Sequence, residues 1–351
     1  MKIHNFSAGP CILPQDVLKK ASDSLINFDN LGLSLIEISH RSKSFVAVMD
    51  KAKSLVRELL QVPDSHEILF LQGGASLEFL MATLNFLPLD GKAAYLDTGT
   101  WSAKAIKEAK IYGEVQVAAS SKDSNYNHIP KSYEVDSDAA YLHFTSNNTI
   151  FGTQFKEFPK HQNALICDMS SDIFSKKINV SDFDLIYAGA QKNMGPAGTT
   201  LVIVKKSALG KTGRTIPSML DYATHIDKES MFNTPPVFAV YTSMLTLEWL
   251  KENGGVDAIE KVNSEKAKAL YTEIDNNPKF KGIAATEDRS TMNATFDLSD
   301  DADRERFDLL CEENGISGLK GHRSVGGYRA SMYNALPFES VQALVKTMKQ
   351  L

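Results

Sequence analysis

Short, almost uninterrupted apolar runs alternate with longer amphipathic stretches between residues 66 and 204. The apolar runs predict seven β-strands, at Glu67–Leu71, Ala93–Leu96, Val115–Val117, Ala140–Phe144, Ala164–Cys167, Leu185–Ala188 and Leu201–Val204. Several runs are continuously apolar, which is typical of strands covered on both faces of a sheet. Helices are expected between strands at Ser76–Leu87 and Ser102–Tyr112. This alternation predicts an α/β fold with a mostly parallel seven-stranded sheet.

Two long amphipathic stretches flank this block and predict helices at Ser44–Leu60 and Val237–Glu252. Beyond them the pattern changes: a charged helix at Ala258–Asn276, an alternating strand at Met292–Leu298, and helices near 302–314 and 337–350. We therefore expect a large domain over residues 16–255. A small α/β domain is expected from residues 1–15 together with 256–351.

Composition narrows the class of protein. Apolar residues make up 43% of the chain and charged residues 23%, which is ordinary for a globular protein. The net charge of −5 gives no electrostatic reason for a nucleic-acid or membrane partner. The three cysteines have no zinc-binding spacing, so no metal is expected. With no apolar run of signal-peptide or membrane-spanning length, a cytoplasmic location is expected.

Lys192 stands out because it lies in a Gly/Pro-rich turn between two apolar strands, Leu185–Ala188 and Leu201–Val204. Most lysines are solvated surface groups, since burying an ammonium is costly. Desolvation in such a turn would lower the pKa of Lys192 and make its amine nucleophilic near neutral pH. Schiff-base chemistry requires such an amine.

Three other features follow predicted strands, where open parallel sheets bind ligands. The turn Gln72–Ser76 precedes a predicted helix, and its backbone N–H groups can bind phosphate. The alternative interpretation is a turn in which Ser76 is only the helix N-cap. Asp168 lies at the end of a predicted strand. Its carboxylate is either a helix cap or the partner of a cationic ligand group. Trp101, in a loop entering a helix, is either a core residue or a platform for a flat ligand. Together with Lys192, these features match the needs of pyridoxal phosphate.

Arginines suggest a site for anionic substrates. His40 and Arg41 form one pair, His322 and Arg323 form another, and Arg329 follows in a Gly-rich segment. Arginine side chains match the oxygens of carboxylates and phosphates. A solvated basic loop is the alternative interpretation.

The motifs around these residues resemble those of the phosphoserine aminotransferases, fold-type I pyridoxal-phosphate enzymes of the class V aminotransferase group. The matching segments span nearly the whole chain: Asn5–Pro10, Ser39–Arg41, Gln72–Ser76, Thr98–Ser102, Asn147–Ile150, Asp168–Ser171, Ala188–Asn193, Phe232–Pro236 and Gly321–Ser331.

The resemblance implies a role for each matching site residue. Lys192 binds the cofactor covalently and carries a proton, and Asp168 pairs with the pyridine nitrogen. Trp101 stacks on the ring and Thr149 hydrogen-bonds its hydroxyl oxygen. The cofactor phosphate is assigned to Ala75, Ser76 and Gln191, with Asn233 and Thr234 from the other subunit of a homodimer. The substrate site is assigned to Ser7, Arg329 for the α-carboxylate, and His40, Arg41, His322 and Arg323 for the distal anion.

The implied reaction is reversible amino transfer between O-phospho-L-serine and 2-oxoglutarate in L-serine biosynthesis. Use of phosphorylated hydroxythreonine of pyridoxine biosynthesis, which presents the same distal phosphate, is left open by the sequence. Ser76 departs from relatives that carry arginine at this position, which leaves the affinity for the substrate phosphate open. Two alternatives remain: a desulfurase or lyase of the same group, and a non-catalytic α/β ligand-binding protein. A desulfurase needs a mobile cysteine near the site, whereas Cys167 and Cys311 are expected in a strand and a helix and Cys11 lies near the start of the sequence.

Overall fold

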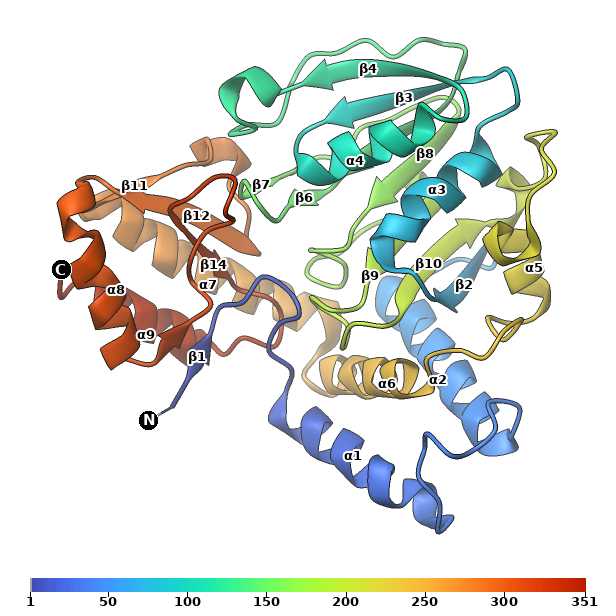
Figure 1. The fold of residues 1–351 in the computed structure, drawn as a ribbon, viewed down its shortest axis with the longest axis horizontal. Coiled ribbons are helices and arrows are strands. Elements are labelled where there is room, and N and C mark those ends of the chain that lie inside the picture. The colour runs from blue at the N-terminus through green and yellow to red at the C-terminus, as the bar shows by residue number, and fades with distance from the viewer. Residues whose placement is uncertain (1) are drawn as a thin grey trace.

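A computed structural model describes residues 2–351 and has a seven-stranded sheet at its centre (Figure 1). Its strand order is β2-β10-β9-β8-β5-β3-β4, and only β10 runs antiparallel to its neighbours. The predicted fold class and all seven predicted strands are confirmed. Their bounds are β2 His66–Leu71, β3 Lys92–Asp97, β4 Glu114–Ser120, β5 Ala139–Thr145, β8 Ala164–Asp168, β9 Leu185–Gly189 and β10 Thr200–Lys205.

Helices cover both faces of this sheet, which explains why the strands are apolar without alternation. In β10, for example, Leu201 and Ile203 pack into one apolar cluster, while Val202 and Val204 pack into another. Helices α2 and α6 contribute to the first cluster and α3 and α4 to the second. The helices of this part are α1 Gln15–Ile26, α2 Lys43–Leu60, α3 Gly74–Phe86, α4 Thr100–Ala109, α5 Tyr222–Asp227 and α6 Val237–Glu252.

The long helix α7, Gly255–Asn276, leads from α6 to a smaller antiparallel sheet of order β11-β12-β14. The strands are β11 Phe280–Gly282, β12 Asn293–Leu298 and β14 Tyr328–Ser331, and the helices are α8 Arg304–Glu313 and α9 Phe338–Met348. The N-terminal strand β1, His4–Asn5, pairs with β13, Ile316–Ser317, so the start of the chain joins this C-terminal part (Figure 1).

The expected alternation of exposed and buried residues in the strand near 292–298 is wrong, because nearly all of β12 is buried. Its polar face packs against the hairpin of β6 Asn147–Asn148 and β7 Thr153–Gln154. Asn293 accepts a hydrogen bond from Asn147 at 2.8 Å, and the Thr295 hydroxyl donates to the Phe151 carbonyl at 2.9 Å. These contacts join the smaller sheet to the edge of the large one where β5 and β8 end.

No helix within residues 2–351 combines the length and apolar character needed to span a membrane.

Candidate active site

A cavity of about 370 Å³ lies where β5, β8 and β9 end, as expected for an open parallel sheet. Nine of the residues predicted for the site line it: Ala75, Ser76, Trp101, Thr149, Asp168, Gln191, Lys192, His322 and Arg329. These residues come from segments far apart in the sequence. The fold therefore brings the predicted lysine, carboxylate, tryptophan, glycine-rich turn and arginine into one space.

The turn that carries Lys192 is held from two sides. The N–H groups of Lys192, Met194 and Gly195 all donate to the Ala190 carbonyl, which winds the chain tightly after β9. Above it, the Cys11 thiol donates to the Lys192 carbonyl at 2.7 Å. Gly9 adopts a φ of +135°, and a Cβ there would lie 3.4 Å from Cγ of Lys192. The N-terminal segment thus restricts the lysine side chain.

The amine of Lys192 is directed into the cavity. Its Nζ donates to the Thr149 hydroxyl at 2.9 Å and lies 5.9 Å from the centroid of the Trp101 ring. Burial lowers the pKa of Lys192; the Asp168 carboxylate opposes this shift and the Arg329 guanidinium adds to it. This lowered pKa agrees with the desolvated lysine that the sequence predicts. A larger fraction of the amine is therefore unprotonated, and nucleophilic, than on an exposed lysine.

Asp168 ends β8 beside the lysine strand, in register with Tyr187 of β9. Its carboxylate is buried, and the Ser170 N–H donates to Oδ1 at 2.9 Å. Burial raises the pKa of Asp168, while the hydrogen bonds from Ser170 and the charge of Lys192 lower it. Ser170 is the one described residue that donates hydrogen bonds to this carboxylate, which leaves it able to pair with a cationic ligand group in the cavity.

The N-terminus of α3 supplies backbone donors. Gly73 and Gly74 both have positive φ, +93° and +64°, and a Cβ on Gly73 would lie 2.5 Å from Leu77. Glycine is therefore required at position 73. The helix begins at Gly74 with Gly73 as its N-cap, so the alternative of Ser76 as N-cap is wrong. The first N–H groups of the helix have no intrahelical partner and can bind an anion.

Trp101 forms one wall of the cavity from the first turn of α4. Its indole Nε1 is buried with no hydrogen-bond partner within the described part of the chain. Lys104, one turn along the same helix, lies with its Nζ 4.6 Å from the ring centroid. This second cation near the tryptophan was not predicted; the three-residue spacing in a predicted helix was the available signal.

Within a single chain, some of the remaining predicted site residues line the cavity and others do not. Arg329 donates to the Thr149 carbonyl at 3.3 Å, and its Nε has no partner among the described residues. His322 lines the same cavity, and its Nδ1 is 2.6 Å from the Ser324 hydroxyl. The remaining predicted residues do not line the cavity: Ser7, His40, Arg41, Asn233, Thr234 and Arg323.

Several residues in contact with the predicted ones were missed. Ser170 orients Asp168, and the Cys11 thiol binds the lysine turn, with burial raising the pKa of Cys11 to about 12. Thr145 and Asn147 also line the cavity. The position of Thr145 at the end of a predicted strand was a usable signal. Nothing in the local sequence around Cys11 indicates its contact with a residue 181 positions away.

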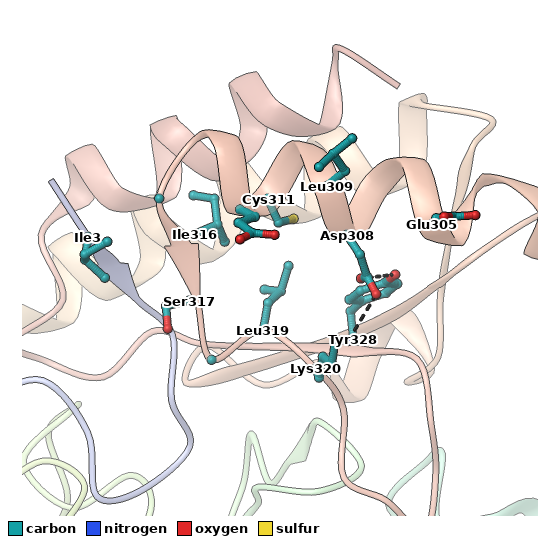
Figure 2. Close-up of a pocket in the computed structure, with 13 residues that line it drawn as sticks. Ile3, Glu305, Asp308, Leu309, Cys311, Ile316, Ser317, Leu319, Lys320 and Tyr328 are labelled. Atoms are coloured by element: carbon teal, nitrogen blue, oxygen red, sulfur yellow. Dashed lines mark hydrogen bonds and ion pairs between the residues drawn. The ribbon is translucent and has the colours of Figure 1, made fainter. Parts of the chain in front are cut away.

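A larger cavity of about 800 Å³ lies between α8 and the segment 315–320 (Figure 2). Its carboxylates include Asp308, which accepts a hydrogen bond from the Tyr328 hydroxyl at 2.9 Å and lies 3.2 Å from Lys320 Nζ. Asp308 is therefore already neutralised by its neighbours. None of the predicted catalytic residues lines this cavity, which leaves the chemistry to the smaller one.

The smaller cavity has the groups that pyridoxal phosphate requires. The N-terminus of α3 suits the phosphate, Trp101 presents a ring face, Asp168 presents a buried carboxylate, and Lys192 presents an amine of lowered pKa. The unpartnered indole nitrogen of Trp101 and Nε of Arg329 are consistent with a cavity built around a polar ligand.

Comparisons with known proteins agree over the whole chain. The family described as Aminotransferase class-V matches residues 3–344. A phosphoserine aminotransferase of Flavobacterium psychrophilum is 65% identical over 352 residues, covering 100% of this chain and 99% of that protein. A solved phosphoserine aminotransferase from Bacillus circulans subsp. alkalophilus has 44% identity and a TM-score of 0.96, covering 99% of this chain and 98% of the other. A PLP-bound phosphoserine aminotransferase from Trichomonas vaginalis has 39% identity and a TM-score of 0.95, covering 99% and 100%.

Proposed function

Because the chain belongs to the class-V aminotransferase family and, within it, to the phosphoserine aminotransferases, we propose that it transfers the amino group of O-phospho-L-serine to 2-oxoglutarate. The products are 3-phosphooxypyruvate and L-glutamate, and the reaction is reversible and belongs to L-serine biosynthesis. Phosphorylated hydroxythreonine, which carries the same distal phosphate, is proposed as a second amino donor. The observation that carries the proposal is the Lys192 amine, 2.9 Å from the Thr149 hydroxyl and in one cavity with Asp168 and Arg329.

The enzyme depends on pyridoxal phosphate. When bound, this cofactor supplies an electron-accepting ring and a carbonyl carbon that exchanges amino groups. We assign its phosphate to the N-terminal N–H groups of α3 with Ala75, Ser76 and Gln191, and its ring to the face of Trp101. With the cofactor bound, the Asp168 carboxylate would pair with the protonated ring nitrogen, and the Thr149 hydroxyl would bind the ring hydroxyl oxygen. Each of these residues lines the cavity.

Lys192 has two tasks in this proposal, binding the cofactor and moving a proton. Its lowered pKa favours the free amine, which accepts the proton from the substrate Cα. The Thr149 hydroxyl and the N-terminal segment over the turn keep Nζ directed into the cavity. Because the Thr149 hydroxyl holds Nζ and the Cys11 thiol holds the backbone carbonyl of the same residue, the lysine returns the proton without a large change in position.

Substrate selection rests on two anion sites. Arg329 binds the α-carboxylate that all substrates share, from a side chain already anchored to the Thr149 carbonyl. His40, Arg41, His322 and Arg323 are assigned to the distal phosphate or γ-carboxylate, and Ser7 belongs to the substrate-contacting N-terminal segment. One cationic site can accept either anion because guanidinium groups match both.

A homodimer completes this site in the proposal. Exposed apolar side chains are concentrated in α1 and the segment before α2, where Leu18, Leu25, Ile26, Leu31, Leu33 and Ile36 lie. A group of this size on one segment is typical of a surface covered by another chain. Asn233 and Thr234 of the partner subunit are assigned to the cofactor phosphate, because in a single chain neither residue lines the Lys192 cavity.

The shared site has a direct test by subunit mixing. K192A and N233A chains are each expected to be nearly inactive as homodimers. A heterodimer contains one site with both wild-type residues, so mixing should restore activity to a fraction of wild type. Mixtures that stay inactive after verified subunit exchange would show that each site is built by one chain.

The remaining expectations stay proposals of the same kind. The division into a large domain over 16–255 and a small domain over 1–15 and 256–351 is supported by two separate sheets, each with its own apolar core. A cytoplasmic location is supported by three unpaired thiols, at Cys11, Cys167 and Cys311.

The proposed reaction is tested with the purified holoenzyme. Phosphoserine and 2-oxoglutarate should give glutamate, and K192A should lose both turnover and the visible absorbance of the lysine-bound cofactor. K177A, at a surface lysine, is the matched control. Absorbance without turnover would favour a ligand-binding protein, whereas release of sulfide from cysteine would favour a desulfurase. The latter is disfavoured because Cys167 and Cys311 are both buried and the Cys11 thiol donates a hydrogen bond to the Lys192 carbonyl.

A further inference from the structure

Lys266 is a fully buried lysine that the proposed mechanism does not use. It lies in the middle of α7 with none of its surface exposed. Within residues 2–351 no carboxylate lies within ion-pair distance of its amine. Burial lowers the pKa of Lys266 to about 7. An apolar side chain of similar length would avoid this desolvation penalty, so the ammonium needs a reason for being there.

The amine of Lys266 binds three backbone carbonyls of one loop. Its Nζ donates to the carbonyls of Met332 at 2.9 Å, Tyr333 at 2.8 Å and Leu336 at 3.2 Å. Three carbonyl acceptors around one tetrahedral nitrogen match the three protons of an ammonium group. One side chain thereby sets the relative orientation of three peptide groups within five residues.

This loop connects the proposed substrate-binding arginine to the lysine turn. Arg329 lies in β14, which ends at Ser331, directly before the first of the bound carbonyls. Further along, the Asn334 N–H donates to Oδ1 of Asn193 at 2.9 Å, and Asn193 follows Lys192 in sequence. Asn263, one turn before Lys266 on α7, donates to the Asn334 side chain at 2.8 Å.

We propose that Lys266 is a positioning residue that fixes Arg329 relative to Lys192 by holding the loop 332–336. This inference rests on the proposed function, because it takes Arg329 as the group that binds the substrate α-carboxylate. The loop is attached at one end to the strand of Arg329 and at its middle to the lysine turn. A change in the orientations of these carbonyls therefore shifts Arg329 relative to Lys192. The substrate must contact both residues, so the distance between them decides how well it binds.

The test compares K266M with K268M, a control at an exposed lysine two positions further on the same helix. In the holoenzyme, K266M should raise KM for phosphoserine and for glutamate by the same factor, roughly tenfold or more, since small misplacements of binding groups have effects of this size. Inhibition by O-phosphoethanolamine, which has the amine and phosphate but no α-carboxylate, should stay as in wild type. K268M should leave every value unchanged.

A double-mutant cycle with R329K separates positioning from mere stabilisation. If Lys266 acts through Arg329, adding K266M to R329K should raise KM by less than twofold. Multiplying effects, or a K266M enzyme of lower thermal stability with wild-type KM values, would overturn the proposal. If K266M does not fold, K266Q keeps two N–H donors and should show an intermediate rise, so a folded K266Q with wild-type KM overturns it equally. Absence of phosphoserine turnover in wild type would instead refute the proposed function.

Discussion

Glu78 provides a test of how the interior of α3 is kept free of charge. It lies one turn into the helix whose N-terminus is assigned to the cofactor phosphate, and its side chain is fully buried. The Tyr222 hydroxyl donates to Oε2 at 2.5 Å, while Oε1 has no partner among the described residues. Burial raises the pKa of Glu78 to about 8, so the folded protein holds this carboxyl neutral at pH 7.

The consequence for stability follows from proton linkage. Between pH 4.5 and 8 the folded state binds one more proton at Glu78 than the unfolded chain does, so stability falls as pH rises. Each pH unit removes about 1.4 kcal/mol, which gives about 3 kcal/mol between pH 5 and pH 7.5. With an unfolding entropy of about 2.1 cal/mol/K per residue, this change shifts the melting temperature by about 4–5 °C.

The proposed substitution is Glu78→Gln, which keeps the shape of the side chain and removes its titratable proton. Melting temperatures of both holoenzymes are measured from pH 5 to 8.5. The wild type should lose about 4–5 °C relative to E78Q across the window, and E252Q, at an exposed glutamate, should show no such trend. Y222F, which removes the hydrogen bond that lowers the pKa of Glu78, should extend the loss to higher pH. A difference between wild type and E78Q that stays constant with pH would refute the reasoning.

Three further predictions concern the site and its support. D168N should keep the shape of the site but lower kcat by roughly 10²–10³, measured as glutamate formation, because a neutral amide cannot hold the ring proton; an unchanged kcat would exclude the ion pair. W101F should weaken pyridoxal phosphate binding by several-fold in an absorbance titration, since the smaller ring offers less stacking area; equal affinity would place the cofactor elsewhere. His143 is buried with its pKa lowered to about 3, so its contribution to stability is present above pH 6.5 and lost as pH falls toward 3. The melting temperature of wild type should therefore fall relative to H143Q below pH 6.5, and parallel curves would contradict this.

The large sheet was predictable because strands that are buried on both faces of a sheet consist of continuous apolar runs. Each predicted strand is present, and at one or both ends it extends one to three residues beyond the predicted range. The sequence also placed Asp168 and Lys192 at the ends of consecutive apolar strands, and β8 and β9 are indeed neighbours. Parallel connections bring such ends to the same edge, so local pattern and topology agree.

Contacts between distant segments were not predictable in the same way. The thiol of Cys11 reaches the lysine turn, and Asn334 reaches Asn193, across more than a hundred residues of chain. A single cysteine or asparagine in a loop carries no periodic signal. The burial of the polar face of β12 was missed for the same reason, because its partner is the hairpin at 147–154 rather than solvent.

The sequence by itself determined the elements, the mostly parallel sheet and the chemical types of the site residues, because hydrophobic periodicity and strand-end motifs are local properties of the chain. Only the tertiary structure decided which of those residues share a cavity with Lys192 and which, such as Asn233 and Arg41, do not. It also decided that a buried ammonium at Lys266 holds the loop between Arg329 and the lysine turn. These outcomes depend on packing between segments far apart in sequence, and the hydrogen bonds that define them exist only once the chain has folded.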